Sequence, residues 1–199
     1  MKQHNVFPEC NVDTNLVGYI LGGYAKHKST CNEVAKAVNQ SDAFAVGIID
    51  ADKRLATMDA GFTRYQQPDD VLDKNTHLAM YIHQDKKRYM FTVSPAMDGF
   101  VWDAAHVMGI NMKALGYKGT FDAFKKETKT IQAATDPQLR RLFQEITDYP
   151  ELKRFRNTLK YLMHFQYNAD SSTAKQFFDG ILSNADLAEM LQHKELEQE

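Results

Sequence analysis

The feature that most constrains the fold is one uninterrupted apolar run at residues 43–49, Ala-Phe-Ala-Val-Gly-Ile-Ile. The run has the length of a strand, and Asp50-Ala51-Asp52 closes it. A strand that is apolar on both faces must be covered on both faces, as happens in parallel sheets flanked by helices. The run therefore predicts an α/β fold with a mostly parallel sheet.

Other segments predict partners for this strand. Val6-Phe7 begins a short apolar run that predicts a brief first strand. Residues 77–83 and 88–93 are strand-like and are separated by four polar residues, so they predict a β-hairpin. Residues 57–76 are polar and weakly patterned, which indicates a loop with a short helix.

Apolar side chains at helical spacing predict helices over residues 13–24, 30–38 and 96–108. Asn11 or Asp13 is expected to cap the first of them, and Gly22-Gly23 to end it.

Beyond residue 111 the pattern is helical throughout. Asp136-Pro137 and Pro150 each open a helix, and two weaker helices follow over residues 173–182 and 186–196. The sequence therefore predicts an α/β domain at residues 1–110 and an all-helical extension at residues 111–199.

Length and composition limit the class of protein. A chain of 199 residues suits one domain with an extension. Cys10 and Cys31 are too few for a disulfide framework, so we expect free thiols. No apolar run approaches the roughly 20 residues of a membrane span, and the first residues lack the apolar core of a signal peptide. These features predict a cytoplasmic protein that does not contact membrane.

The charges are distributed unevenly. Residues 112–160 carry 11 basic and 6 acidic side chains, whereas residues 161–199 carry 2 and 7. A basic segment of this kind either binds a polyanion or forms a solvated helix face. Lys125, Lys126 and Lys129 fall within about one helical turn, so we expect them to face the same strand of phosphates if nucleic acid binds there.

Carboxylates follow the predicted strands. Asp50 and Asp52 come at the carboxyl end of the buried strand, where ligands of open α/β sheets bind. Glu9 follows the first strand, which can neighbour the Asp50 strand and end at the same edge. Carboxylate oxygens are preferred ligands of Mg²⁺ and Mn²⁺, so Glu9, Asp50 and Asp52 are candidate metal ligands.

Three further residues are less specific. Asp98 opens the helix after the hairpin, where it is either a favourable partner of the helix dipole or a fourth ligand. Lys53 and Arg54 directly follow the aspartates and either hold a phosphate or balance the local charge.

The order of these motifs resembles the Toprim domain of topoisomerases, primases, and OLD-type and related small nucleases. The matching pieces are Pro8-Glu9 after the first strand, Asp50-Ala51-Asp52 after the buried strand, and residues 94–98, Ser-Pro-Ala-Met-Asp, after the hairpin. Asp13 matches an acidic residue that opens the first helix in nuclease-like members. Cys10 stands where the family usually has a glycine.

The resemblance covers roughly residues 4–105 and implies Mg²⁺-dependent chemistry on nucleic-acid phosphodiester bonds. Asp50 and Asp52 would hold the metal, and Glu9 would be a ligand or the general acid/base. The implied partner is nucleic acid, with DNA favoured, and a protein partner or a homodimer is compatible with it.

Two alternatives stay open. One is a phosphatase with Asp50 as nucleophile and Asp52 as acid/base, although Lys53-Arg54 differs from the small residues that usually follow that motif. The other is a non-catalytic Toprim-like subunit of a nucleic-acid-processing complex, which would bind metal or DNA without turnover.

Overall fold

The computed structural model describes residues 3–51, 58–71 and 73–196. A five-stranded sheet lies at its centre, in the order β1-β2-β5-β4-β3. The strands are β1 (Val6–Pro8), β2 (Ala45–Asp50), β3 (Phe62–Arg64), β4 (Leu78–His83) and β5 (Arg88–Val93). The apolar run is therefore a strand, as predicted, and it lies inside the sheet between β1 and β5.

The sheet is mixed, and this corrects the expectation of a mostly parallel one. β1, β2 and β5 are parallel neighbours, but β5 pairs antiparallel with β4, and β4 pairs antiparallel with β3. The predicted hairpin is β4–β5, and a tight turn can join only antiparallel strands. β3 then extends the hairpin from a segment whose polar sequence predicted only a loop and a short helix.

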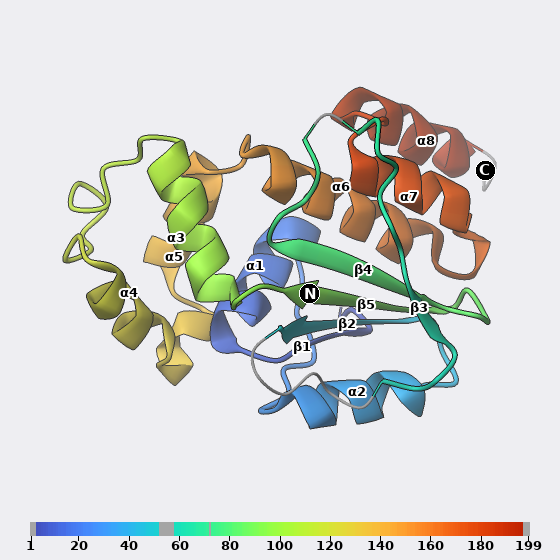
Figure 1. Ribbon diagram of the computed structural model, residues 1–199, viewed down its shortest axis with the longest axis horizontal. Helices are drawn as coiled ribbons and strands as arrows, with labels where there is room; N and C mark the ends of the chain where they lie inside the picture. Colours follow the sequence, from blue (N-terminus) through green and yellow to red (C-terminus); the bar gives the residue numbers. More distant parts are fainter. Residues whose placement is uncertain (1–2, 52–57, 72, 197–199) are drawn as a thin grey trace.

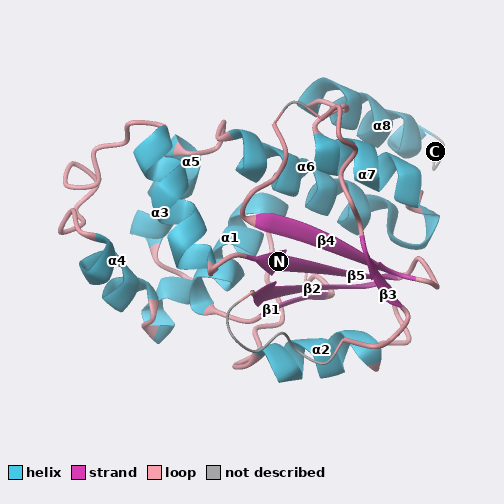
Figure 2. Cartoon of the chain, in the orientation of Figure 1, coloured by secondary structure: helices cyan, strands magenta, loops and turns pink. Residues whose placement is uncertain are grey.

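Helices cover both faces of the sheet (Figure 1). The helices are α1 (Asn11–Leu21), α2 (Cys31–Asn39), α3 (Met97–Val107), α4 (Phe121–Thr128), α5 (Pro137–Glu145), α6 (Pro150–Phe165), α7 (Ser171–Asp179) and α8 (Asn184–Leu196). Two 3₁₀ turns, η1 (Ile131–Ala134) and η2 (Gln166–Asn168), lie among them. Figure 2 shows α3, α4 and α5 grouped beyond one end of the strands.

The two faces of the sheet have separate apolar clusters. On one face, Phe7, Ile49 and Met90 pack against Val34 and Val38 of α2. The opposite face belongs to a larger cluster that includes Val46 and Ile48 of β2 together with Phe155 of α6 and Phe177 of α7. Because the sheet is covered on both sides, the run in β2 is apolar at every position up to Ile49.

The two predicted domains share this larger cluster. Its members run from Val6 in β1 to Leu187 in α8, on both sides of the expected boundary near residue 110. The helices after residue 111 pack directly against the core of the sheet. The boundary itself stays a prediction.

Several predicted helix ends are confirmed. Asp136 caps α5, Pro150 opens α6, and Gly22 ends α1 with φ 66°. The first cap was predicted wrongly, because Cys10 rather than Asn11 or Asp13 is the N-cap of α1. A thiol is an unusual cap, and sequence preferences favour oxygen side chains there.

No helix in the described part of the chain is long and apolar enough to cross a membrane.

Candidate functional site

The carboxyl ends of the three parallel strands meet at one edge of the sheet. Glu9 follows β1, Asp50 ends β2, and Asp98 lies five residues after the end of β5. All three line a single cavity of about 410 Å³. The structure thus brings together three of the carboxylates expected from the sequence, and their role as metal ligands stays a prediction.

Backbone amides hold two of these carboxylates in place. One oxygen of Glu9 accepts a hydrogen bond from the Asp50 amide at 3.0 Å. Oδ1 of Asp50 accepts from the Met97 amide at 3.0 Å, in the first turn of α3. The Asp50 side chain therefore ties the end of β2 to the helix that follows β5, which fixes the direction of its carboxylate.

Asp13 lies behind this edge in the first turn of α1. Its side chain is fully buried, and Oδ2 accepts from the Cys10 amide at 3.1 Å. Its other oxygen, Oδ1, is buried without a hydrogen-bond partner. Burial raises the pKa of the Asp13 carboxyl well above its ordinary value, and the negative charge of Asp50 raises it further.

The Cys10 thiol belongs to the same cluster. One ligand atom from each of Cys10, Asp13 and Asp50 lies within 4.8 Å of the other two. Burial is the main reason that the pKa of the Cys10 thiol is raised, and the charges of Asp13 and Asp50 add to it. A cation placed among these groups would reverse both effects, because it stabilises the anionic forms.

An extra edge segment brings a histidine to the cavity. Residues 24–28 run parallel to β1, with the amides of Lys26 and Lys28 donating to the carbonyls of Val6 and Pro8 at 2.8 and 2.9 Å. The segment therefore ends at the same edge as β1, and His27 lines the cavity.

Another part of the cavity wall comes from the end of α4 and the segment that follows it. Thr128, Lys129 and Ile131 line it, and Ile131 is 79 % exposed. Buried Asn15 of α1 anchors this segment, because its amide nitrogen donates to the carbonyls of Ala133 and Asp136 at 2.8 and 2.9 Å. The cavity is thus lined by three carboxylates and one lysine.

The three lysines expected to act together point to different places. Lys129 lines the carboxylate cavity, Lys126 lines a separate groove, and the Lys125 ammonium lies 5.7 Å from the centre of the Phe121 ring. The shared contact of these lysines with one strand of phosphates stays a prediction. Lys129 is the C-cap of α4, and its amide donates to the carbonyl of Lys125 at 3.3 Å.

Asp52, Lys53 and Arg54 lie outside the described residues, so their predicted roles stay predictions. Several residues that line the cavity were not predicted as site residues, among them Cys10, His27, Ser29 and Thr128. Cys10 could have been found from its place beside Glu9. Nothing in residues 24–28 distinguishes them from a loop, because their pairing with β1 is a tertiary contact.

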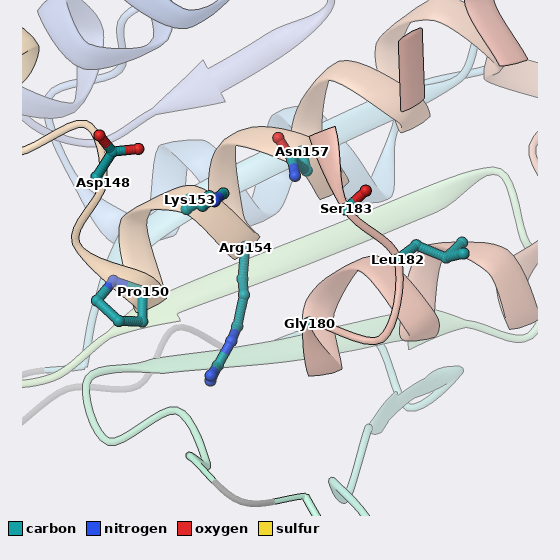
Figure 3. Close-up of a pocket in the computed structure, with 8 residues that line it drawn as sticks. All are labelled: Asp148, Pro150, Lys153, Arg154, Asn157, Gly180, Leu182 and Ser183. Carbon is teal, nitrogen blue, oxygen red and sulfur yellow. The ribbon is translucent and has the colours of Figure 1, made fainter. Parts of the chain in front are cut away.

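A second cavity, of about 240 Å³, lies between α6 and the α7–α8 connection (Figure 3). Lys153, Arg154 and Asp148 line it. The Arg154 guanidinium is already bonded to the Asp73 carbonyl and to Asn75 Oδ1. These hydrogen bonds from the Arg154 guanidinium stabilise the loop at residues 73–75. We assign no chemistry to this cavity.

Comparisons of the chain with models of protein families, with curated proteins and with solved structures found no match.

Proposed function

We propose that this chain is a divalent-cation-dependent, Toprim-like protein that acts on phosphodiester bonds of nucleic acid. The observation that carries the proposal is the meeting of Glu9, Asp50 and Asp98 in one cavity at the carboxyl edge of the parallel strands. This is the edge where open α/β sheets bind ligands, and the spacing of the motifs is the one that resembles Toprim domains.

The donor set fits a cation. Buried Asp13 has one oxygen without a hydrogen-bond partner and lies close to Asp50, and a buried carboxylate of this kind is costly unless a positive charge compensates it. Glu9 and Asp50 would hold Mg²⁺ or Mn²⁺, with Asp98 as a further ligand. When bound, such an ion stabilises charge on the phosphoryl group and lowers the pKa of water.

His27 is suited to accept a proton in this cavity. The Thr14 hydroxyl has one proton and donates it to the Cys10 carbonyl at 2.8 Å. The Thr14 oxygen lies 3.0 Å from His27 Nδ1. Because the Thr14 proton is already used, this oxygen accepts the hydrogen bond from Nδ1, which therefore carries the ring proton. Nε2 of His27 then has the free lone pair, and we assign it the role of accepting the proton of the attacking water.

Lys129 supplies a positive charge in the same cavity, where it would contact a phosphate of the substrate. A phosphate contact carries no sequence information, so the proposed activity should depend little on sequence.

The test is cleavage of end-labelled single- and double-stranded DNA and RNA with Mg²⁺ or Mn²⁺. Asp50→Asn keeps an oxygen that can accept from Met97, so the first turn of α3 is preserved. We expect Asp50→Asn and Glu9→Gln each to slow cleavage by about a hundredfold, which corresponds to about 2.7 kcal/mol of lost transition-state stabilisation. Asp42→Asn, an exposed change before the start of β2, is the matched control and should leave the rate unchanged.

A second variant tests the proton acceptor. His27→Ala should slow cleavage by about a hundredfold or more, and added imidazole should restore part of the rate. Cleavage that continues in chelator, or that is equally fast in Asp50→Asn, would contradict the proposal. A phosphorylated Asp50 trapped with a phosphomonoester would instead establish the phosphatase alternative.

Binding of nucleic acid can be measured separately. We expect Lys129→Gln to weaken DNA binding and to reduce the slope of log K against log salt, while Lys126→Gln has the smaller effect because Lys126 lies in another groove. Equal effects of the two changes would show that the cavity wall is not the contact surface.

A further inference from the structure

We propose that the cation site of this protein includes the Cys10 thiolate and selects a thiophilic divalent cation of the Zn²⁺ class over Mg²⁺. The proposal rests on the proposed function and deepens it by assigning a thiophilic cation to the site in place of Mg²⁺ or Mn²⁺, and it can fail while that function stands. It concerns a ligand set of Cys10, Asp13 and Asp50, drawn from the first turn of α1 and the end of β2.

The three side chains lie close enough together to bind one ion. The Cys10 sulfur and one oxygen from each aspartate lie within 4.8 Å of one another, and ligand atoms on one Zn²⁺ lie about 2.0–2.3 Å from the metal. Small rotations of the three side chains therefore bring them to a common ion. Among the described residues, no other group of three or more metal-ligating side chains comes this close together.

One atom of the cluster lacks a partner in the protein. Oδ1 of Asp13 is buried and has no hydrogen-bond partner, although the rest of the side chain is held firmly by the Cys10 amide. Buried polar atoms are nearly always satisfied, so an orphaned carboxylate oxygen beside a thiol and a second carboxylate marks a position for a cation.

The backbone around the thiol holds the sulfur beside the aspartates. Cys10 is the N-cap of α1, and its sulfur lies 3.4 Å from the Asp13 amide. This contact holds the side chain against the first turn, on the same side as the two aspartates. A thiolate is a soft ligand that favours Zn²⁺, Co²⁺ and Cd²⁺ over Mg²⁺, so its presence changes which cation binds best.

Binding requires the thiol to lose its proton. The Cys10 S–H proton leaves to solvent as the metal–sulfur bond forms, and the two positive charges of the ion offset two of the three negative charges of the thiolate and the two carboxylates. Proton release on metal addition is therefore a second, independent signature of the site.

The experiment titrates the full chain, stripped of metal, with Co²⁺ as a spectroscopic probe. A thiolate ligand gives an intense near-ultraviolet sulfur-to-cobalt charge-transfer band, whereas oxygen ligands alone do not. We expect the band in the wild type and in Cys31→Ser, whose thiol lies at the start of α2 and does not line the cavity.

Cys10→Ser should abolish the band and weaken Zn²⁺ binding by at least about tenfold. Serine is a good N-cap, so the first turn of α1 should survive, and circular dichroism will verify it. Asp13→Asn, which keeps an oxygen toward the Cys10 amide, should also weaken Zn²⁺ binding.

A band that survives in Cys10→Ser, or that disappears in Cys31→Ser, overturns the proposal. Mg²⁺ binding without any cobalt–sulfur band also overturns it, while leaving the proposed function intact. If neither Co²⁺, Zn²⁺ nor Mg²⁺ binds, the inference and the proposed function both fail.

Discussion

Replacing Asp13 with asparagine should stabilise the metal-free protein at neutral pH, even though Asp13 is fully buried in the first turn of α1. The oxygen of the new amide can still accept from the Cys10 amide, as Asp13 Oδ2 does at 3.1 Å. Its NH₂ group then takes the place of the oxygen that has no partner, and it can donate toward the Asp50 carboxylate. The change removes a buried negative charge and keeps the cap.

The direction in which the stability changes with pH follows from the pKa of Asp13. Burial is the main cause that raises the pKa of Asp13 in the folded chain above the ordinary value of 3.8, and the charge of Asp50 raises it further. At a pH between the ordinary pKa and the folded pKa, the folded state therefore binds more protons than the unfolded state. The stability contributed by protonated Asp13 is complete below pH 3.8 and is lost as the pH rises through the folded pKa. The window of the effect therefore begins at about pH 4 and extends upward.

Within that window, the change in the free energy of unfolding with pH comes from the binding of one proton. The free energy of unfolding of the wild type should fall relative to Asp13→Asn by up to about 1.4 kcal/mol for each pH unit. For a fold of this size this corresponds to a difference in melting temperature of about 3–6 °C per pH unit. Thermal melts in chelator from about pH 4 to about pH 8 measure it.

Asp170→Asn is the matched control. Asp170 also bonds an amide of a first helical turn, that of Thr173 at 2.8 Å, but this hydrogen bond lowers its pKa. Asp170→Asn should be slightly less stable than the wild type at neutral pH, and this difference in stability should vanish as the pH falls. If Asp13→Asn melts below the wild type at neutral pH, and the gap does not change with pH, the reasoning about a buried uncompensated charge is refuted.

Three other changes test the packing that positions the cavity. Gly47→Ala puts a Cβ 2.4 Å from the Met90 sulfur, so urea unfolding should show a loss of about 1–3 kcal/mol from overpacking. Glu151→Ala leaves the His77 amide, now bonded at 2.8 Å, without its acceptor, and should cost about 1–3 kcal/mol in the same assay. Asn15→Ala frees the segment after α4, and hydrogen exchange there should become faster while exchange in β2 is unchanged.

The sequence alone determined the central part of this fold. Seven consecutive apolar residues can be satisfied only by cover on both faces, and β2 has that cover from α2 on one side and from the larger cluster on the other. The hairpin β4–β5 and the starts of α5 and α6 were equally predictable, because turns, caps and prolines act through neighbouring residues. The same local rules placed Glu9 and Asp50 at strand ends.

Only the tertiary structure decided what surrounds those carboxylates. Asp13 was noticed as a motif position, but its orphaned oxygen depends on burial by elements far along the chain. His27 and Lys129 reach the cavity through the pairing of residues 24–28 with β1 and through the anchor at Asn15, two contacts between segments that carry no local signature. Sequence patterns report which face of an element is buried, whereas the companions of a buried charge are set by how the elements pack together.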